Sequence, residues 1–133
     1  MEKMTVLVEA EINPTETEEK VKTAVANMFG NLSIQVKPSK VGSVLTAEAK
    51  NREALENLRN TLRRDRVRAA ARKVLYAGCR EKTIRFCLNK QVAFVGHVSF
   101  SQETGECPLG PIKVTIESEN PRELIDWLAP KIT

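Results

Sequence analysis

The sequence is poor in residues that build metal and redox sites. It holds one histidine and three cysteines among 133 residues, and no two cysteines form a Cys-x-x-Cys pair. With a single histidine, a zinc site would need unusual ligands, so we expect no metal and no cofactor. An odd number of cysteines without a recognisable signal peptide favours reduced thiols over a disulfide framework.

Long apolar runs and catalytic motifs are missing as well. No apolar run approaches the roughly 20 residues of a membrane span, and the N-terminal stretch lacks the cleavage site of a secretory signal. We therefore expect a cytoplasmic protein with no membrane contact. The sequence has no P-loop, G-x-G-x-x-G loop or G-x-S-x-G elbow. His97 is an isolated histidine that a surface or core position explains, so we expect no enzyme.

The apolar pattern predicts one α+β domain over residues 1–133. Apolar alternation indicates strands near 4–12, 32–37, 44–50, 83–88, 92–100 and 112–118. Helices are predicted from the cap Asn13 to Phe29, after Asn51, and from Asn120. Because the strands follow one another over short links, we expect a mainly antiparallel sheet with helices packed on one face, a two-layer sandwich.

The second helical stretch changes phase in its middle. Its first apolar stripe consists of Leu55, Leu58 and Leu62. Its second stripe consists of Val67, Ala70, Ala71 and Val74. At about 100° per residue the stripes point roughly 150° apart, so one straight helix cannot bury both. Either the helix breaks between Arg63 and Val67, where Asp65 could cap the restart, or the second stripe packs elsewhere, for example on a second subunit.

Basic residues are concentrated around this phase change. Residues 59–90 carry eleven Lys/Arg against two Asp/Glu, whereas the segments before and after have net charges of −2 and −3. The candidate nucleic-acid-binding residues are Arg59, Arg63, Arg64, Arg66, Arg68, Arg72 and Lys73. Arginines without partner acids repel one another, and a polyanion such as RNA would relieve that repulsion. A solvated face or a subunit contact explains the same residues without RNA, and both alternatives stay open.

Aromatic residues give little support for single-strand binding. The chain has one Trp, one Tyr and four Phe. Phe86, Phe94 and Phe100 share the apolar parity of their predicted strands, so we expect them in the core. The sequence therefore predicts no platform of exposed aromatic rings on which bases could stack.

Four motifs follow one another along the chain: NPTETEEKVKTAVANMF, LNKQVAFVG, PLGPIKVTI and DWLAP. Together they resemble the archaeal uncharacterised protein family 0201 over nearly the whole sequence. The resemblance implies a fold similar to that of the large-subunit ribosomal protein that contacts 5S ribosomal RNA, and a homodimer. It implies no activity and supplies no catalytic residue.

Within these motifs we expect structural roles for Asn89, Lys90, Gln91, Pro108, Gly110 and Trp127. Asn89 suits a turn, and the proline before Ile112 holds Gly110 extended. Lys90 and Gln91 could hold a backbone carbonyl or a carboxylate, or could face a ligand. The sequence thus predicts a non-enzymatic protein that binds RNA through 59–73. The alternative is a homodimeric structural or protein-interaction module that does not bind RNA, with the second apolar stripe as a candidate contact.

Overall fold

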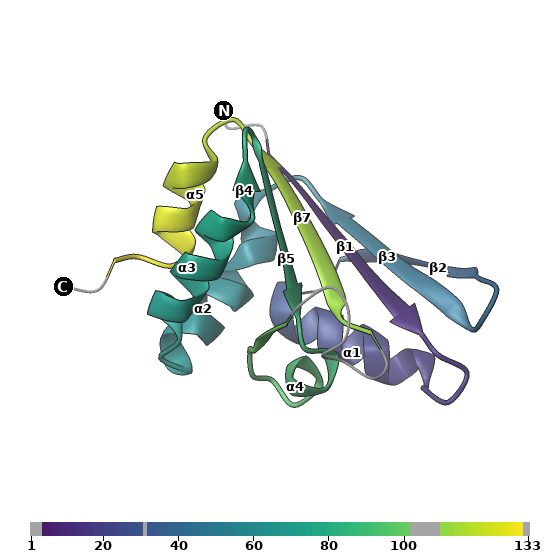
Figure 1. The fold of residues 1–133 in the computed structure, drawn as a ribbon. Coiled ribbons are helices and arrows are strands. Elements are labelled where there is room, and N and C mark those ends of the chain that lie inside the picture. Colours follow the sequence, from purple (N-terminus) through teal and green to yellow (C-terminus); the bar gives the residue numbers. More distant parts are fainter. Residues whose placement is uncertain (1–3, 31, 102–109, 132–133) are drawn as a thin grey trace.

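The computed structural model describes residues 4–30, 32–101 and 110–131 (Figure 1). The elements in chain order are β1 (Met4–Ile12), α1 (Glu18–Phe29), β2 (Ser33–Pro38), β3 (Ser43–Ala49), the 3-10 turn η1 (Arg52–Leu55), α2 (Glu56–Arg64), α3 (Arg68–Ala77), β4 (Cys79–Arg80), β5 (Thr83–Leu88), α4 (Lys90–Phe94), β6 (Phe100–Ser101), β7 (Ile112–Ser118) and α5 (Pro121–Leu128). The fold is α+β, as predicted, with five α-helices in the described part of the chain.

The strands form one open antiparallel sheet of seven strands. Its order is β2-β3-β1-β7-β5-β4, and β6 also pairs with β5. In the central strand β1, Val8 lies opposite Ala47 of β3 and Val114 of β7. Because directly paired residues point to the same side of a sheet, this register collects apolar side chains on one face.

One face of the sheet is covered by helices and the other is open. Along β1 the even-numbered residues from Met4 to Ile12 are buried, whereas Leu7, Glu9 and Glu11 are exposed. The covered face contacts α1, α3 and α5, and Figure 1 shows α2, α3 and α5 grouped together with α1 and α4 lower in the view. Large side chains of the shared core include Phe29, Leu45, Leu58, Leu62, Ile116 and Leu124.

The second helical stretch breaks where its phase change predicts. α2 ends at Arg64 and α3 begins at Arg68, and Arg66 between them has a left-handed φ of 57°. The N–H of Arg66 donates to the carbonyl of Arg63, and the N–H of Val67 donates to that of Leu62. This pair of bonds is the Schellman motif, which ordinarily has glycine at the position of Arg66.

The break allows both halves of the stretch to pack on the same core. Leu62 and Ala71 are both fully buried, and so is Leu75, which the sequence analysis did not include in the second stripe. Ala70, expected in that stripe, is exposed. Asp65 does not cap α3, whose N-cap position is Val67.

Helix α1 begins four residues later than predicted. Its N-cap is Thr17, whose hydroxyl accepts a hydrogen bond from the Lys20 N–H at 3.3 Å. Glu16 does fold back onto Asn13, whose backbone N–H and side-chain amide donate to its carboxylate at 3.0 and 2.9 Å. These hydrogen bonds close a turn that precedes α1. They do not cap the first turn of the helix. The same carboxylate also accepts from Lys90, which holds Glu16 outside the helix.

Residues 92–100 do not form the predicted strand. The short helix α4 ends at Phe94, and only Phe100 and Ser101 form β6. Asn89 caps α4 by accepting a hydrogen bond from the Val92 N–H at 3.0 Å. Gly96 follows with a φ of 85°, a conformation that glycine adopts without strain. A single helical turn is too short to show helical periodicity, so its apolar residues were mistaken for strand alternation.

Candidate nucleic-acid interface

The seven basic residues around the helix break divide into those with partners and those without. Arg59 has a partner: its Nε donates to the carbonyl of Trp127 at 2.9 Å, and its guanidinium lies 5.1 Å from the centre of the indole ring. Arg52 lies at the same distance from that ring. Trp127 is half-buried against the core. Cation–π contacts and a hydrogen bond therefore join η1 and α2 to α5, and Arg59 stabilises that junction.

Arg72 joins α3 to the same helix. Its guanidinium donates to the carboxylate of Asp126 at 2.6 Å and to the carbonyl of Ala129 at 3.2 Å. It also lies 5.0 Å from the centre of the Tyr76 ring. The hydrogen bond from Arg72 lowers the pKa of Asp126, outweighing the opposite effect of burial. Arg72 is thus engaged within the fold.

Arg64 takes part in a cluster centred on Asp65. One carboxylate oxygen of Asp65 accepts from the Val98 N–H at 3.0 Å, and the other lies 3.1 Å from Nδ1 of His97 and 3.3 Å from Nε of Arg64. Arg64 also donates to the carbonyl of Gly96. Burial acts to raise the pKa of Asp65, but the hydrogen bonds from Val98, His97 and Arg64 together lower it. Asp65 therefore fastens the helix break to the loop after α4.

The remaining basic residues have no such partner. In the part of the chain that the structure describes, no ion pair or side-chain hydrogen bond involves Arg63, Arg66, Arg68 or Lys73. Arg63 and Arg66 are exposed, and Arg68 is half-buried. We call Arg63, Arg66 and Arg68 the break cluster, because they flank the junction of α2 and α3. Lys73 is exposed farther along α3.

The electrostatics of the break favour an anion. The first turn of α3 contains no acidic residue, and among the described residues no side chain caps it. Arg68 occupies the first position of that helix, where the positive end of the helix dipole disfavours a cation. The C-terminus of α2 and the Asp65 carboxylate add negative potential at the same break, but Asp65 is already engaged by His97, Arg64 and Val98. The attraction for an anion therefore comes chiefly from the exposed arginines.

Lys90 of the LNKQ motif is a buried cation with its own partners. Its ammonium donates to the carbonyl of Glu11 at 2.7 Å and to the carboxylate of Glu16 at 2.9 Å, and only 3% of its side chain is exposed. Burial acts to raise the pKa of Glu16, but the bonds from Lys90 and Asn13 outweigh it and lower this pKa. Lys90 thus ties α4 to the end of β1 and to the turn before α1. Gln91 is exposed.

Phe94 is the site residue that sequence reasoning misplaced. Phe86 and Phe100 pack in or against the core with ring centroids 5.9 Å apart, as predicted. Phe94 instead is 38% exposed, and its neighbour Val95 is 66% exposed. The signal that could have placed Phe94 outside is the Asn89 cap followed by Gly96, which together bracket one turn of helix.

The remaining motif residues divide between described and undescribed parts of the chain. Pro108 lies outside the described residues. Gly110 has a φ of 84°, so it requires glycine and is not held in the ordinary extended conformation that the sequence analysis expected. A Cβ at Gly110 would also lie 3.3 Å from the Glu11 carboxylate.

Over residues 4–30, 32–101 and 110–131, no cluster of three or more His, Cys, Asp or Glu side chains is arranged to hold a metal ion. Within the same ranges, no helix is both long and apolar enough to cross a bilayer.

A family model described as RNA binding matches residues 5–118 of this α+β chain. The chain is 44% identical over 122 residues to a UPF0201 protein of Pyrobaculum calidifontis, covering 91% of this chain and 85% of that protein. It is 42% identical over 126 residues to one of Sulfurisphaera tokodaii, covering 95% and 87%. The chain belongs to the UPF0201 family.

Solved structures agree with this assignment. The crystal structure of a UPF0201 protein from Methanococcus jannaschii superposes with a TM-score of 0.86 and 31% identity, covering 97% of this chain and 95% of that one. A DUF54 protein from Methanothermobacter thermautotrophicus has a TM-score of 0.65 at 15% identity, covering 96% and 99%, and shares the fold. The likeness to a ribosomal protein and the homodimer stay predictions.

Proposed function

We propose that the protein binds RNA through the break cluster and that this role is not catalytic. The observation that carries the proposal is the contrast among neighbouring arginines. Arg59, Arg64 and Arg72 are engaged by acceptors of their own chain, whereas the break cluster has no acidic partner among the described residues. Phosphate groups would supply the missing negative charge. The match to a family model described as RNA binding supports this choice of polyanion.

The strained backbone conformation of Arg66 suggests that its side chain has a functional role. A left-handed conformation costs a non-glycine residue roughly 1–2 kcal/mol, and Arg66 adopts it with a φ of 57°. Glycine would end α2 in the same way without this strain. Strain held in a folded protein is a reason to look for function at that residue, and here the strained residue displays an unpaired guanidinium.

The expected binding mode follows from the number of available cations. Phosphate contacts position a protein on a nucleic acid but carry no sequence information, so we expect shallow sequence preference. Each contact on a single strand contributes about −0.7 to the log–log slope of affinity against salt. If the three arginines of the break cluster contact phosphates, with or without Lys73 as a fourth contact, the log–log slope should lie between roughly −2 and −3.

The alternative is a homodimeric or protein-binding module in which the break cluster faces an acidic surface of a partner. Val67 and Val74, expected at such a contact, are half-buried and pack partly against the chain's own core. Substituting each by aspartate and measuring mass by light scattering tests this alternative. A dimer that becomes a monomer supports the contact, and a dimer unchanged by both substitutions removes these residues from it.

The RNA proposal is tested by a charge-removing triple variant. Replacing Arg63, Arg66 and Arg68 together by glutamine keeps helix propensity and removes three cations. Fluorescence anisotropy with a labelled oligoribonucleotide, repeated over a salt series from about 50 mM, should show the slope smaller by about two units. The affinities of the triple variant for unrelated RNA sequences should fall by similar factors.

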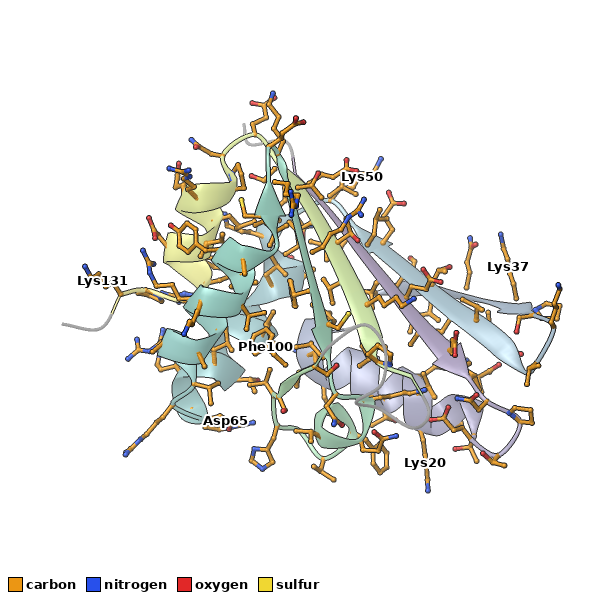
Figure 2. The ribbon with its side chains drawn as sticks, viewed as in Figure 1. Lys20, Lys37, Lys50, Asp65, Phe100 and Lys131 are labelled. Carbon is orange, nitrogen blue, oxygen red and sulfur yellow. The ribbon has the colours of Figure 1, made fainter. Side chains whose placement is uncertain are left out.

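A matched control removes the same charge far from the break. Lys37, Lys40 and Lys50 are exposed on the β2–β3 side, and Figure 2 shows Lys37 and Lys50 well away from Asp65 at the break. Their triple replacement by glutamine should leave the slope nearly unchanged. Native protein that binds no RNA at low salt would overturn the proposal, and so would a slope that survives the loss of the break cluster.

A further inference from the structure

An exposed aromatic ring lies at the end of α4, just before the loop that Asp65 and Arg64 fasten to the helix break. Phe94, at the end of α4, is 38% exposed, and two residues later the carbonyl of Gly96 accepts a hydrogen bond from Arg64. Two residues of chain span at most about 7 Å, so the backbone of Phe94 lies close to the Gly96 carbonyl that Arg64 contacts. Figure 2 shows Asp65 and Lys20 along one edge of the molecule, and Figure 1 shows α4 between them.

The ring also forms one wall of a cavity of about 280 Å³. Thr17, Lys20 and Gln91 line the cavity as well, and the buried pair of Lys90 and Glu16 adjoins it. This volume is just below the range of roughly 300–1,000 Å³ typical of sites for drug-sized ligands. The cavity therefore suits a small planar group better than a large cofactor.

The polar groups of the cavity suit a nucleobase. The amide of Gln91 offers both a donor and an acceptor, which is what the hydrogen-bonding edge of a base requires. The ammonium of Lys20 lies over the Phe94 ring, 5.7 Å from its centre. A base stacking on this face would displace the ammonium, which could then pair with the carbonyl oxygen or phosphate of the same nucleotide.

The platform is held rigidly in place. The side-chain amide of Asn27 in α1 donates to the carbonyls of Ala93 and Phe94 at 2.9 and 3.0 Å. The Lys90 ion pair fixes the other end of α4. A wall that is already ordered loses little conformational entropy when a ligand stacks on it.

The open face of the sheet does not offer such a platform. The described residues that the strands expose on that face include Leu7, Glu9, Thr46 and Glu117, and none of those described is aromatic. Sheets that bind single-stranded RNA stack its bases on aromatic side chains. The ring of Phe94 is thus the better place for a base.

We propose that the cavity beside Phe94 binds one unpaired base of a single-stranded RNA whose phosphates contact the break cluster. This inference rests on the proposed RNA-binding function and specifies its substrate class. A base in a duplex is stacked and paired, so it cannot enter the cavity. Stacking on one aromatic ring is worth about 1–3 kcal/mol per base, which corresponds to a five- to 150-fold preference for single strands.

The test compares a labelled single strand with the same strand annealed to its complement, at one salt concentration and over a salt series. Replacing Phe94 by alanine should weaken single-strand binding about fivefold or more, leave duplex binding unchanged and leave the salt slope unchanged, because no charge is removed. Phe94→Tyr keeps an aromatic ring and should retain the preference. Val95→Ala removes apolar surface next to the ring and serves as the matched control. If Phe94→Ala unfolds, Phe94→Leu keeps the apolar bulk and should show the same loss.

The outcomes separate this inference from the proposed function. If the wild-type protein binds neither the single strand nor the duplex, both the proposed function and this inference are overturned. Wild-type protein that binds RNA but does not distinguish the two forms would overturn the inference alone. A single-strand preference that persists in Phe94→Ala and Phe94→Leu would also overturn it, and the exposed pair Phe94 and Val95 would then fit a protein contact.

Discussion

Lys90 and the break cluster carry the same kind of charge in opposite surroundings. Lys90 is 3% exposed and donates to two oxygens of its own chain. Arg63 and Arg66 are exposed, and the described residues offer them no carboxylate. A buried cation with satisfied hydrogen bonds contributes to a unique fold, whereas an exposed cation without a partner contributes a field that a polyanion can use. The two sites should therefore respond differently to substitution.

The largest effect on stability is expected at the buried site. Lys90→Met keeps the length of the side chain but removes the donor to the Glu11 carbonyl and the cation beside Glu16, whose carboxylate keeps only the two hydrogen bonds from Asn13. Breaking a buried pair from one side costs about 3 kcal/mol or more, and chemical denaturation should show a loss of this size. The salt slope of RNA binding should stay as in the wild type. A stability within experimental error of the wild type would show that Lys90 is not the structural cation described here.

Glu16→Gln provides the control for that substitution. The amide oxygen of glutamine can still accept from Lys90, but the charge is lost. The double variant Lys90→Met with Glu16→Gln should lose less stability than the two single variants added together, because each single variant leaves one charge of the buried pair without its counter-charge.

A smaller effect is expected at Asp65, which links the two regions. Asp65→Asn keeps an acceptor for the Val98 N–H and removes the negative charge that faces His97 and Arg64. Loss of one charge-assisted hydrogen bond costs about 1.5 kcal/mol. Urea unfolding at neutral pH should show this loss.

The pH dependence of that loss follows from the lowered pKa of Asp65. A carboxyl whose folded pKa lies below its unfolded value, about 3.9, stabilises the fold fully above the unfolded pKa. The stabilisation is lost as pH falls through the folded pKa. The difference between wild type and Asp65→Asn should therefore be constant near neutral pH and shrink below about pH 4. A difference that does not shrink below about pH 4 would contradict this assignment.

Local patterns in the sequence predicted several of the elements that surround these two sites. The strands at 83–88 and 112–118 and the break between Arg63 and Val67 were predicted by periodicity alone and are confirmed. The sequence also suggested the helix start at Pro121. These features depend on neighbouring residues, which a sequence shows directly.

Local patterns could not predict contacts between residues that lie far apart in the sequence. Arg72 is engaged by Asp126, 54 residues away, and Arg59 by Trp127, 68 residues away. Counting charges could therefore not separate the arginines that join helices from those without an acidic partner among the described residues. The misplaced Phe94 has a different cause, since one turn of helix imitates the alternation of a strand over so few residues.

The smallest effect on stability is expected for a single substitution in the break cluster, at Arg66. Arg66→Gly removes the strain of a left-handed arginine with a φ of 57° and gives the Schellman motif its usual residue. Glycine also has more conformational freedom to lose on folding, by roughly 0.5–1 kcal/mol. The net result should be unchanged or slightly higher stability, by at most about 1 kcal/mol, measured by thermal unfolding.

The same substitution removes one cation from the break cluster, so the salt slope of RNA binding should fall by about 0.7. A weaker affinity in a protein that is at least as stable cannot be attributed to unfolding. Arg63→Gln is the matched control, because it removes a cation of the same cluster where the backbone is helical: the slope should change equally and the stability hardly at all. Arg66→Gly with its slope intact would show that this guanidinium does not contact phosphate. A clear loss of stability would instead mean that Arg66 supports the break, as Lys90 supports α4.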